Sequence, residues 1–501
     1  MGSDQSDSVT TTRRRLFSVP LAGVGGGLFG QFGATGSVTA SGESIPAYLE
    51  RHVPDLLDRY DVPGASIALI EDGEVTWTGA FGTADFTEDR PTTETTRFRV
   101  QSITKSVTAW GVLKLVEQDE IGLDDPIGSH LTRWEPPDAD YSWEDVTVRR
   151  VLSHSAGLPA GGYETVPLDE EPPPIEAALS GNAGGPAVRP TAEPGEFRYS
   201  NPGYALLELL IEDVTGRDYA AYMHEEVLRS LEMDRATFEV TEQLRSELAT
   251  EHFVDGTPVP LSHGPARAHG GLYATAEDIA RFVAAGTETP EEPPGRDLLA
   301  PESIAELYTS TVETTGFYGL ATDDAGLGCF VEALADGKRA VMNGGQGAGS
   351  WNWFHAIPET GDGIVILTNS ERSVQLIADV VEAWIERRGF STASLARAGR
   401  WVRLPIWILG GIAVGLALRL GYGGITGQRS FAPLSERDGT IRMVLAGLGL
   451  TTLGLWWTLG REAVAFFLPV LAEWVGLALS VVVALLLVTV LFPRTDSGET
   501  T

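Results

Sequence analysis

Apolar positions near the two ends of the central region alternate in a way that predicts strands. Two apolar runs, Gly64–Ile70 and Glu74–Phe81, are joined by Glu71-Asp72-Gly73, which is a hairpin turn sequence. Two further runs, Ser350–Ile357 and Ile364–Asn369, are separated by a short turn that contains proline and glycine. The pattern therefore predicts one hairpin at each end of this region.

Helical spacing fills the sequence between the hairpins. Five segments carry it, besides a stretch that starts near residue 102: Thr147–Ser153, Tyr204–Val214, Tyr219–Leu231, Thr275–Ala285 and Val374–Arg387. The stretch Pro159–Gly195 is rich in Pro, Gly and Glu and predicts a long surface loop. Strands at both ends with helices between them predict an α+β fold, in which an antiparallel sheet built from N- and C-terminal segments lies beside a helical lobe.

Hydropathy changes character at both ends of the chain. Residues 1–40 run from polar through Arg13-Arg14-Arg15 to an apolar, Gly-rich stretch and then to small residues, which is typical of a twin-arginine export signal. Leu404–Leu418, Met443–Leu459 and Ala463–Phe492 are almost free of charge. A span needs about 20 apolar residues, so we predict three transmembrane helices, the first of them short.

These patterns divide the chain into five parts. We expect an export signal at 1–40, a folded domain at 41–390, a linker at 391–403, a membrane region at 404–492 and a tail at 493–501. Arginines stand both before the first span and in the 419–442 loop, so the positive-inside rule alone leaves the orientation open. The export signal favours a multi-pass protein of the cell membrane with its folded domain outside.

Charge narrows the functional classes further. The net charge is −33, from 69 acidic and 36 basic residues, and this argues against a nucleic-acid partner. The acids are spread along the chain and only three of the basic residues are lysines, which favours a protein hydrated for high salt, a halophilic adaptation. The single cysteine, Cys329, permits no internal disulfide and is expected to be a small buried residue.

One of those three lysines stands next to a candidate nucleophile. Ser102 and Lys105 are three residues apart where an extended run gives way to helical spacing, so they share one helix face. A serine hydroxyl needs a neighbour that takes its proton, and an amine at this spacing meets that need. Ser-x-x-Lys alone is also compatible with a helix N-cap followed by a surface lysine.

Several motifs together resemble the serine β-lactamase and penicillin-binding-protein-like hydrolases, in the branch of class C β-lactamases, DD-peptidases and esterases. Ser102-Ile103-Thr104-Lys105 matches the first motif and Tyr199-Ser200-Asn201 matches the second, Tyr-x-Asn. Supporting segments occur in the family's order, and the resemblance covers about residues 44–388.

The resemblance implies roles for these residues. Ser102 would be acylated, and Lys105 with Tyr199 would handle the proton, with the lysine ammonium favouring a Tyr199 phenolate as general base. Backbone N–H groups of Ser102 and Gln346 would form the oxyanion hole, and Asn201 would orient Lys105 and a substrate amide.

The third family motif departs from its pattern. The family has Lys-Thr-Gly or His-x-Gly there, on a strand at the edge of the site, and this chain has Asn343-Gly344-Gly345. We assign Asn343 to substrate binding and expect a weaker affinity for anionic substrates, because an amide carries no charge. His269-Gly270-Gly271 has the expected letters but precedes a helical start, so we interpret it as a turn, and His355 as a packed side chain.

Two hypotheses remain open at this stage. The first is an exported, membrane-anchored serine hydrolase that acts on a small-molecule or peptide substrate, and the second is a non-catalytic ligand-binding or sensor domain on a membrane stem. We predict lipid contact through the C-terminal helices, no cofactor and no metal, since the eight histidines lack ligand spacing. The oligomeric state is not predicted.

Overall fold

The computed structural model describes residues 43–289, 292–316, 318–391, 394–427, 437–461, 464 and 469–492. The predicted export signal and the predicted tail lie outside the described residues. The chain divides into two units, Met1–Glu43 and Ser44–Thr501, and the helices and strands of the described residues belong to the second.

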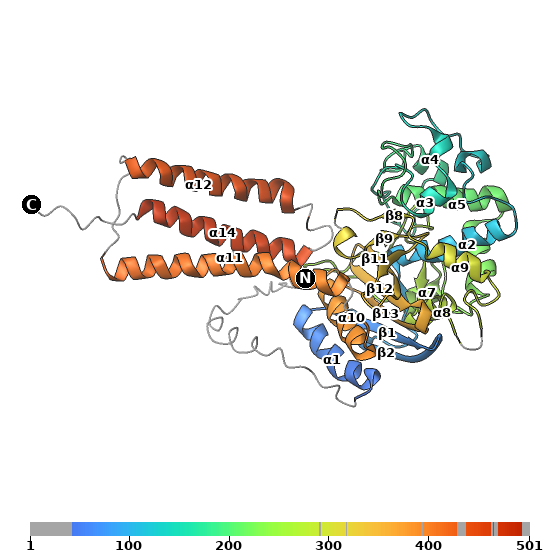
Figure 1. Ribbon diagram of the computed structural model, residues 1–501, viewed down its shortest axis with the longest axis horizontal. Helices are drawn as coiled ribbons and strands as arrows, with labels where there is room; N and C mark the ends of the chain where they lie inside the picture. Colours follow the sequence, from blue (N-terminus) through green and yellow to red (C-terminus); the bar gives the residue numbers. More distant parts are fainter. Residues whose placement is uncertain are drawn as a thin grey trace, which may run out of the picture. The chain divides into compact units, whose positions relative to one another are not determined.

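The described part of the second unit is organised around an antiparallel sheet with the strand order β3-β2-β1-β13-β12-β11-β10-β9-β8 (Figure 1). Its strands are β1 Gly64–Glu71, β2 Glu74–Asp85, β3 Arg90–Pro91, β8 Val312–Glu313, β9 Asp324–Ala325, β10 Phe330–Ala333, β11 Arg339–Gly347, β12 Ser350–Ile357 and β13 Asp362–Thr368. The two predicted hairpins are β1–β2 and β12–β13, and β1 pairs directly with β13. The prediction of a sheet built from both ends of the domain is therefore confirmed.

Alternation along the strands gives the sheet two apolar faces. On β1, Ile67 and Leu69 pack with α1 (Ile45–Tyr60) and α10 (Val374–Arg388), whereas the neighbouring residues of the strand face the core of the helical side. The sequence analysis did not predict α1. Its signal is Leu49, Val53 and Leu57 at a spacing of four, after the N-cap Ser44.

The opposite face carries the helical lobe. The helices on this side are α2 Thr104–Glu117, α3 Val148–Leu152, α4 Ile175–Leu179, α5 Asn201–Thr215, α6 Tyr219–Met223, α7 Glu242–Glu247, α8 Ala276–Ala285 and α9 Pro301–Leu307. The short helical turns are η1 Gln101–Ile103, η2 Ile127–His130, η3 Trp143–Asp145, η4 His224–Leu228, η5 Tyr318–Leu320 and η6 Pro358–Thr360. Two small ladders complete it: β4 Phe98–Arg99 with β7 Tyr273–Ala274, and β5 Val166–Pro167 with β6 Ser262–His263.

Two predictions for the lobe need correction. The expected helix Tyr219–Leu231 is α6 followed by the π-helical turn η4, so its backbone is not a regular α-helix throughout. The expected surface loop Pro159–Gly195 contains α4 and β5. Ile175, Ala178 and Leu179 of α4 are buried, and this burial offsets the weak local helical pattern.

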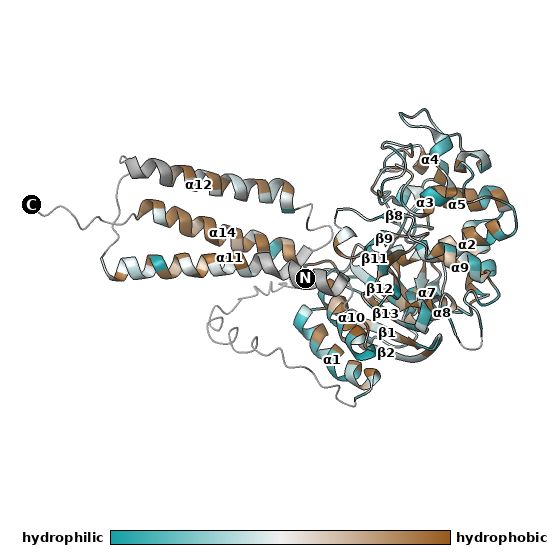
Figure 2. Cartoon of the chain, viewed as in Figure 1, coloured by the Kyte–Doolittle hydropathy of each residue, from teal (hydrophilic) through white to brown (hydrophobic). Residues whose placement is uncertain are grey.

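The C-terminal region consists of α11 Ser394–Ile425, α12 Arg437–Leu455 with the π-helical turn η7 Trp456–Gly460, and α14 Pro469–Leu491. Trp407–Ile425 and Leu471–Leu491 are, by length and composition alone, apolar enough to cross a membrane (Figure 2), and only 11% and 22% of the residues in their apolar stretches are buried. The second predicted span, Met443–Leu459, falls on α12 and η7 and stays a prediction. The predicted linker 391–403 is helical from Ser394, and the first apolar helix is long rather than short.

Glycines in β11 let the nucleophile segment approach the sheet closely. A Cβ on Gly345 would overlap the carbonyl oxygen of Val100, and a Cβ on Gly347 would overlap the side-chain amide of Gln101. Only glycine leaves room for η1 against this strand.

We predict that Gly345→Ala lowers the free energy of unfolding by about 1–3 kcal/mol, because the added methyl group displaces η1 from β11. Chemical denaturation of the purified domain measures this change. Gly264→Ala is the control, since its Cβ would meet neighbours only at ordinary contact distance, the nearest being 3.7 Å away. Equal stability of the two variants would contradict the close approach of η1 to β11.

Candidate active site

Ser102 lies in a strained turn between β4 and α2. Gln101, the residue before it, has φ 52°, a left-handed conformation that is costly for a residue with a side chain. Its side-chain amide donates to Glu251 Oε1 at 2.9 Å and to Ser350 Oγ at 3.2 Å. The Val100 N–H donates to the Leu272 carbonyl at 3.0 Å, so both sides of the turn are held.

The three predicted catalytic side chains are in contact. Lys105 Nζ and the Tyr199 hydroxyl each lie 2.9 Å from Ser102 Oγ. Tyr199 is 97 residues from Ser102 along the chain, so this contact is a product of the fold.

Lys105 is almost completely buried, with 1% of its surface exposed. Its amine also donates to the His269 carbonyl at 2.7 Å, and it lies over the rings of Tyr199 and Tyr204 at 5.0 and 5.5 Å from their centroids. Burial lowers the pKa of Lys105 well below its usual value. The environment therefore favours a neutral amine with a lone pair available.

Tyr199 lies among aromatic rings. The His154 ring centroid lies 4.2 Å from that of Tyr199, and Tyr318 stacks on the same ring at 4.9 Å with an interplanar angle of 15°. Burial raises the pKa of the Tyr199 phenol above its usual value, although its hydrogen bond to Ser102 acts in the opposite direction. The expected phenolate is therefore not favoured, and a neutral tyrosine that donates to Ser102 agrees better with this environment.

His154 connects the Tyr199 segment to α3. Its backbone is left-handed, at φ 59°, its carbonyl accepts from the Arg198 N–H at 2.7 Å, and its Nδ1 accepts from the Ser200 N–H at 3.2 Å. Burial and the nearby Lys105 charge lower the pKa of His154 well below its usual value, which keeps the ring neutral and able to accept. No role for His154 was predicted from the sequence.

Asn201 is the first residue of α5, directly after the N-cap Ser200. Its side-chain oxygen is buried and has no hydrogen-bond partner among the described residues. The two hydrogen bonds of Lys105 go to Ser102 and His269, so the predicted contact from Asn201 to Lys105 is not observed. An unpaired acceptor at this position is compatible with the predicted substrate amide.

Gln346 lies on β11 in a part of the strand that has one strand neighbour. β10 pairs only with Arg339–Met342 of β11, whereas β12 pairs with β11 as far as Gly347. The second half of β11 is therefore a local sheet edge, and it faces η1 through the close glycine contacts. This edge is where the predicted oxyanion hole of Ser102 and Gln346 N–H groups would lie.

The structure corrects the substrate-binding role predicted for Asn343. Its side chain is 3% exposed, and its amide donates to Ser106 Oγ at 2.9 Å, Gly328 O at 3.2 Å and Ser102 O at 3.3 Å. Its Oδ1 accepts from the Gly344 N–H at 2.8 Å. Asn343 therefore connects the nucleophile turn and α2 to strand β11 through its hydrogen bonds to Ser102 O and Ser106 Oγ. Its amide hydrogens are used in these contacts and are not presented to a substrate.

His269 lies in a turn and His355 is a packed side chain, as the sequence predicts. His269 is in a turn closed by bonds from the Gly270 and Gly271 N–H groups to the Arg267 carbonyl, but its own carbonyl holds Lys105, a role that sequence reasoning missed. His355 is fully buried in β12 with its ring 5.8 Å from that of Trp384, and burial lowers its pKa to about 4.

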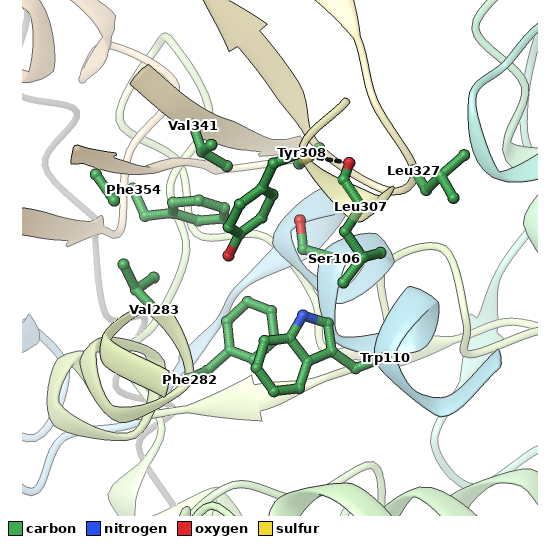
Figure 3. A pocket seen from close by; sticks show the side chains of 11 residues that line it. Ser106, Trp110, Phe282, Val283, Leu307, Tyr308, Leu327, Val341 and Phe354 are labelled. Atoms are coloured by element: carbon green, nitrogen blue, oxygen red, sulfur yellow. Dashed lines mark hydrogen bonds between the residues drawn. The ribbon is translucent and has the colours of Figure 1, made fainter. Parts of the chain in front are cut away.

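A small void lies behind the nucleophile helix. Its volume is about 10 Å³, roughly one water, and Ser106, Trp110, Phe282 and Tyr308 are among the side chains around it (Figure 3). Cys329 also lines it, donates to the Leu307 carbonyl at 3.4 Å, and has its pKa raised to about 12 by burial. The expectation of a small buried cysteine is confirmed, and the void is too small for a substrate.

Within the described residues, no group of three or more His, Cys, Asp or Glu is placed to hold a metal ion.

This sheet, with a serine, a lysine and a tyrosine converging between it and a helical lobe, defines a protein of the serine β-lactamase and DD-peptidase-like type. The Beta-lactamase family model matches residues 49–382, and the chain belongs to that family.

Individual relatives are distant. A Beta-lactamase from Yersinia enterocolitica is 28% identical over 357 residues, which cover 66% of this chain and 88% of that protein. Protein flp from Staphylococcus aureus is 27% identical over 206 residues, and the match covers 40% of each chain.

Solved structures show the same fold. An octameric penicillin-binding protein homologue from Pyrococcus abyssi has a TM-score of 0.56 at 26% identity, covering 67% of this chain and 77% of that one. D-alanine carboxypeptidase AmpC from Burkholderia cenocepacia has a TM-score of 0.55 at 20% identity, covering 68% of this chain and 100% of that one. The family model ends at residue 382, before the first C-terminal helix, α11.

We predict that Asn343→Asp lowers the free energy of unfolding by about 1–3 kcal/mol, because it places a carboxylate against two carbonyl oxygens and removes the donors. The same variant should acylate more slowly, since the nucleophile turn loses its support. Asn182→Asp, at an exposed position, is the matched control for denaturation and acylation. A variant as stable and active as the control would show that Asn343 does not hold the turn.

Proposed function

We propose that this chain is an exported, membrane-anchored serine hydrolase that acts through an acyl-enzyme on an ester, amide or β-lactam-like carbonyl. The observation that carries the proposal is the position of Ser102 Oγ, which lies 2.9 Å from both the Lys105 amine and the Tyr199 hydroxyl. A nucleophile with a buried amine on one side and a hydroxyl donor on the other has the groups that acyl transfer requires.

In the first half-reaction, neutral Lys105 accepts the Ser102 proton as Oγ bonds to the substrate carbonyl carbon. The carbonyl π electrons move to oxygen, and the backbone N–H groups of Ser102 and Gln346 stabilise the oxyanion. The bond to the leaving group then breaks, and the leaving group takes the proton from Lys105 by way of Tyr199. Water repeats the sequence on the acyl-enzyme and releases the acid.

This assignment of protons differs from the one drawn from sequence. Burial raises the pKa of Tyr199 and lowers the pKa of Lys105, so the neutral pair is favoured over phenolate and ammonium. Tyr199 then donates to Ser102 Oγ, Ser102 donates to Lys105, and Lys105 donates to the His269 carbonyl. The Ser102 hydroxyl in this chain of hydrogen bonds then has both a donor, Tyr199, and an acceptor, Lys105.

The substrate we propose is a neutral ester or amide. The position where the family carries a cation holds Asn343, whose amide hydrogens bond to protein groups. A substrate carboxylate would therefore find no partner charge there. The Beta-lactamase and D-alanine carboxypeptidase relatives act on carbonyl substrates of the same general class.

The cellular setting is also a proposal. Two apolar helices and a twin-arginine-like N-terminus support export and anchoring, with the hydrolase domain outside the cell. The net charge of −33 with three lysines supports a saline environment. The second predicted span, over α12 and η7, completes the proposed multi-pass region.

The competing hypothesis of a non-catalytic sensor domain has the absence of the third-motif cation in its favour. Against it stands the contact of Ser102 with both Lys105 and Tyr199. A buried amine without a carboxylate partner lowers the stability of the fold, so a site that had lost its activity would not be expected to keep it.

We predict that a fluorophosphonate or penicillin probe labels the wild-type chain in high salt and adds one acyl or phosphonyl mass. Ser102→Ala should remove the added mass completely, because among the described residues Ser102 carries the hydroxyl that is hydrogen-bonded to Lys105. Intact-mass spectrometry measures both results. Tight ligand binding without labelling of the wild type would favour the sensor domain.

We predict that Lys105→Ala slows acylation by about 10²–10⁴-fold, the usual effect of removing a general base. In the wild type, acylation should fall as pH decreases through the lowered pKa of Lys105, because the protonated amine cannot accept the Ser102 proton. Lys114→Ala is the control, since Lys114 lies on the same helix and donates to the Leu298 carbonyl. Unchanged turnover in Lys105→Ala would refute the proton transfer.

A further inference from the structure

A buried carboxylate, that of Glu208, bonds to the same backbone turn as the catalytic lysine. Glu208, on α5, is 2% exposed, and its Oε2 accepts from two successive backbone N–H groups, those of Arg267 at 2.5 Å and Ala268 at 2.8 Å. The next residue in the turn is His269, whose carbonyl accepts from Lys105 at 2.7 Å. The carboxylate and the catalytic amine therefore hold consecutive peptide groups of one turn.

The same turn is held from the other side by α2. Thr108 Oγ1 donates to the Ala268 carbonyl at 2.9 Å and accepts or donates a bond with the Tyr219 hydroxyl at 2.7 Å. The peptide groups of residues 267–269 are thus bonded to α2 and α5 together. A shift of the turn would move the His269 carbonyl away from the Lys105 amine.

We propose that Glu208 is a positioning residue for Lys105, which sets the place of its hydrogen-bond acceptor through the 267–269 turn and makes acylation depend on the ionisation of Glu208. The inference rests on the proposed function of the Ser102 site. Glu208 lies outside the three motifs, and with Lys105 it would be a second group whose ionisation affects acylation of Ser102.

The surroundings of Glu208 make it sensitive to pH near neutrality. Burial raises the pKa of Glu208 to about 7, opposed by the Arg267 charge and the two backbone N–H groups, while Glu212 raises it slightly. The charged and titratable groups that face it from the packed elements are Arg267, Glu212, Tyr163 and Tyr219, with Asp218 paired to Arg267 at 2.7 Å. Below this pKa the protonated carboxyl accepts more weakly and no longer neutralises Arg267.

The helix that carries Glu208 also carries the second motif. Tyr199 and Ser200 lead directly into α5, and Glu208 lies two turns further along the same helix. A single rigid helix therefore sets both the Tyr199 hydroxyl and the lysine's acceptor relative to Ser102, and a displacement at Glu208 is transmitted to the proton-transfer pair.

Two substitutions at Glu208 separate its charge from its hydrogen bonds. In Glu208→Gln the amide oxygen replaces the acceptor of both N–H groups, so we expect acylation by a fluorophosphonate probe to stay near the wild-type rate at alkaline pH. The fall in rate that the wild type shows as pH drops through about 7 should be absent or displaced to lower pH. Glu208→Leu leaves both N–H groups buried and unpaired, and acylation should be about 10²-fold slower at every pH.

The matched control is Glu212→Gln, one turn further along α5. Glu212 lies 3.7 Å from Arg267 and accepts from the Tyr219 N–H at 3.1 Å, but it does not bond to the 267–268 backbone. Its acylation rate at alkaline pH should match that of the wild type, and its pH profile should move only slightly to lower pH, because Glu212 makes only a small contribution to the raised pKa of Glu208. Thermal unfolding of all variants, followed by circular dichroism, identifies any that fail to fold, and if Glu208→Leu is among them the pH profile of Glu208→Gln decides.

The outcomes separate the two levels of the proposal. No acylation of the wild type by any probe refutes the proposed function. Acylation of the wild type together with an unchanged pH profile in Glu208→Gln refutes the positioning role alone. A profile that is clearly displaced in Glu208→Gln and only slightly displaced in Glu212→Gln supports it, because a merely structural carboxylate would change stability without moving the profile.

Discussion

The active site depends on one amine removed from water. Lys105 has 1% of its surface exposed, no carboxylate pairs with it among the described residues, and its hydrogen bonds go to a hydroxyl and a backbone carbonyl. An isolated ammonium in such a place is costly, and this cost keeps the amine neutral. The other features of the site, from the neutral Tyr199 to the turn at residues 267–269, maintain that dry environment and give the amine its two partners.

The sheet and the lobe contribute different things to this arrangement. The sheet supplies β11, whose glycines admit the η1 turn and whose second half is a local edge. The lobe supplies α5, which carries Tyr199 and Asn201 at one end and Glu208 two turns later. Two side chains stabilise the contact between these parts. Asn343 donates to the Ser102 carbonyl, and the His154 ring packs against the Tyr199 ring.

The places where prediction failed share a physical cause. Asn343 stands where the family places a cation, so sequence comparison assigned it to substrate, yet its strand turns that side chain toward α2. Burial disfavours the predicted Tyr199 phenolate, which sequence could not show, because motifs indicate that a lysine and a tyrosine meet but not how much water surrounds them. The short helix α4 and the strand β5 were missed in a stretch rich in Pro and Gly, since their order comes from burial against the lobe rather than from local propensity.

The sequence by itself determined the two hairpins, most helices of the lobe, the apolar C-terminal helices and the identities of Ser102, Lys105 and Tyr199, because these follow from local periodicity and short motifs. Only the tertiary structure decided which backbone carbonyl receives Lys105, which face Asn343 presents and that Glu208 holds the intervening turn. The contacts of Lys105 and Glu208 with the 267–269 turn join residues at least 59 positions apart through backbone groups that every residue possesses, so no pattern of side chains along the chain encodes them.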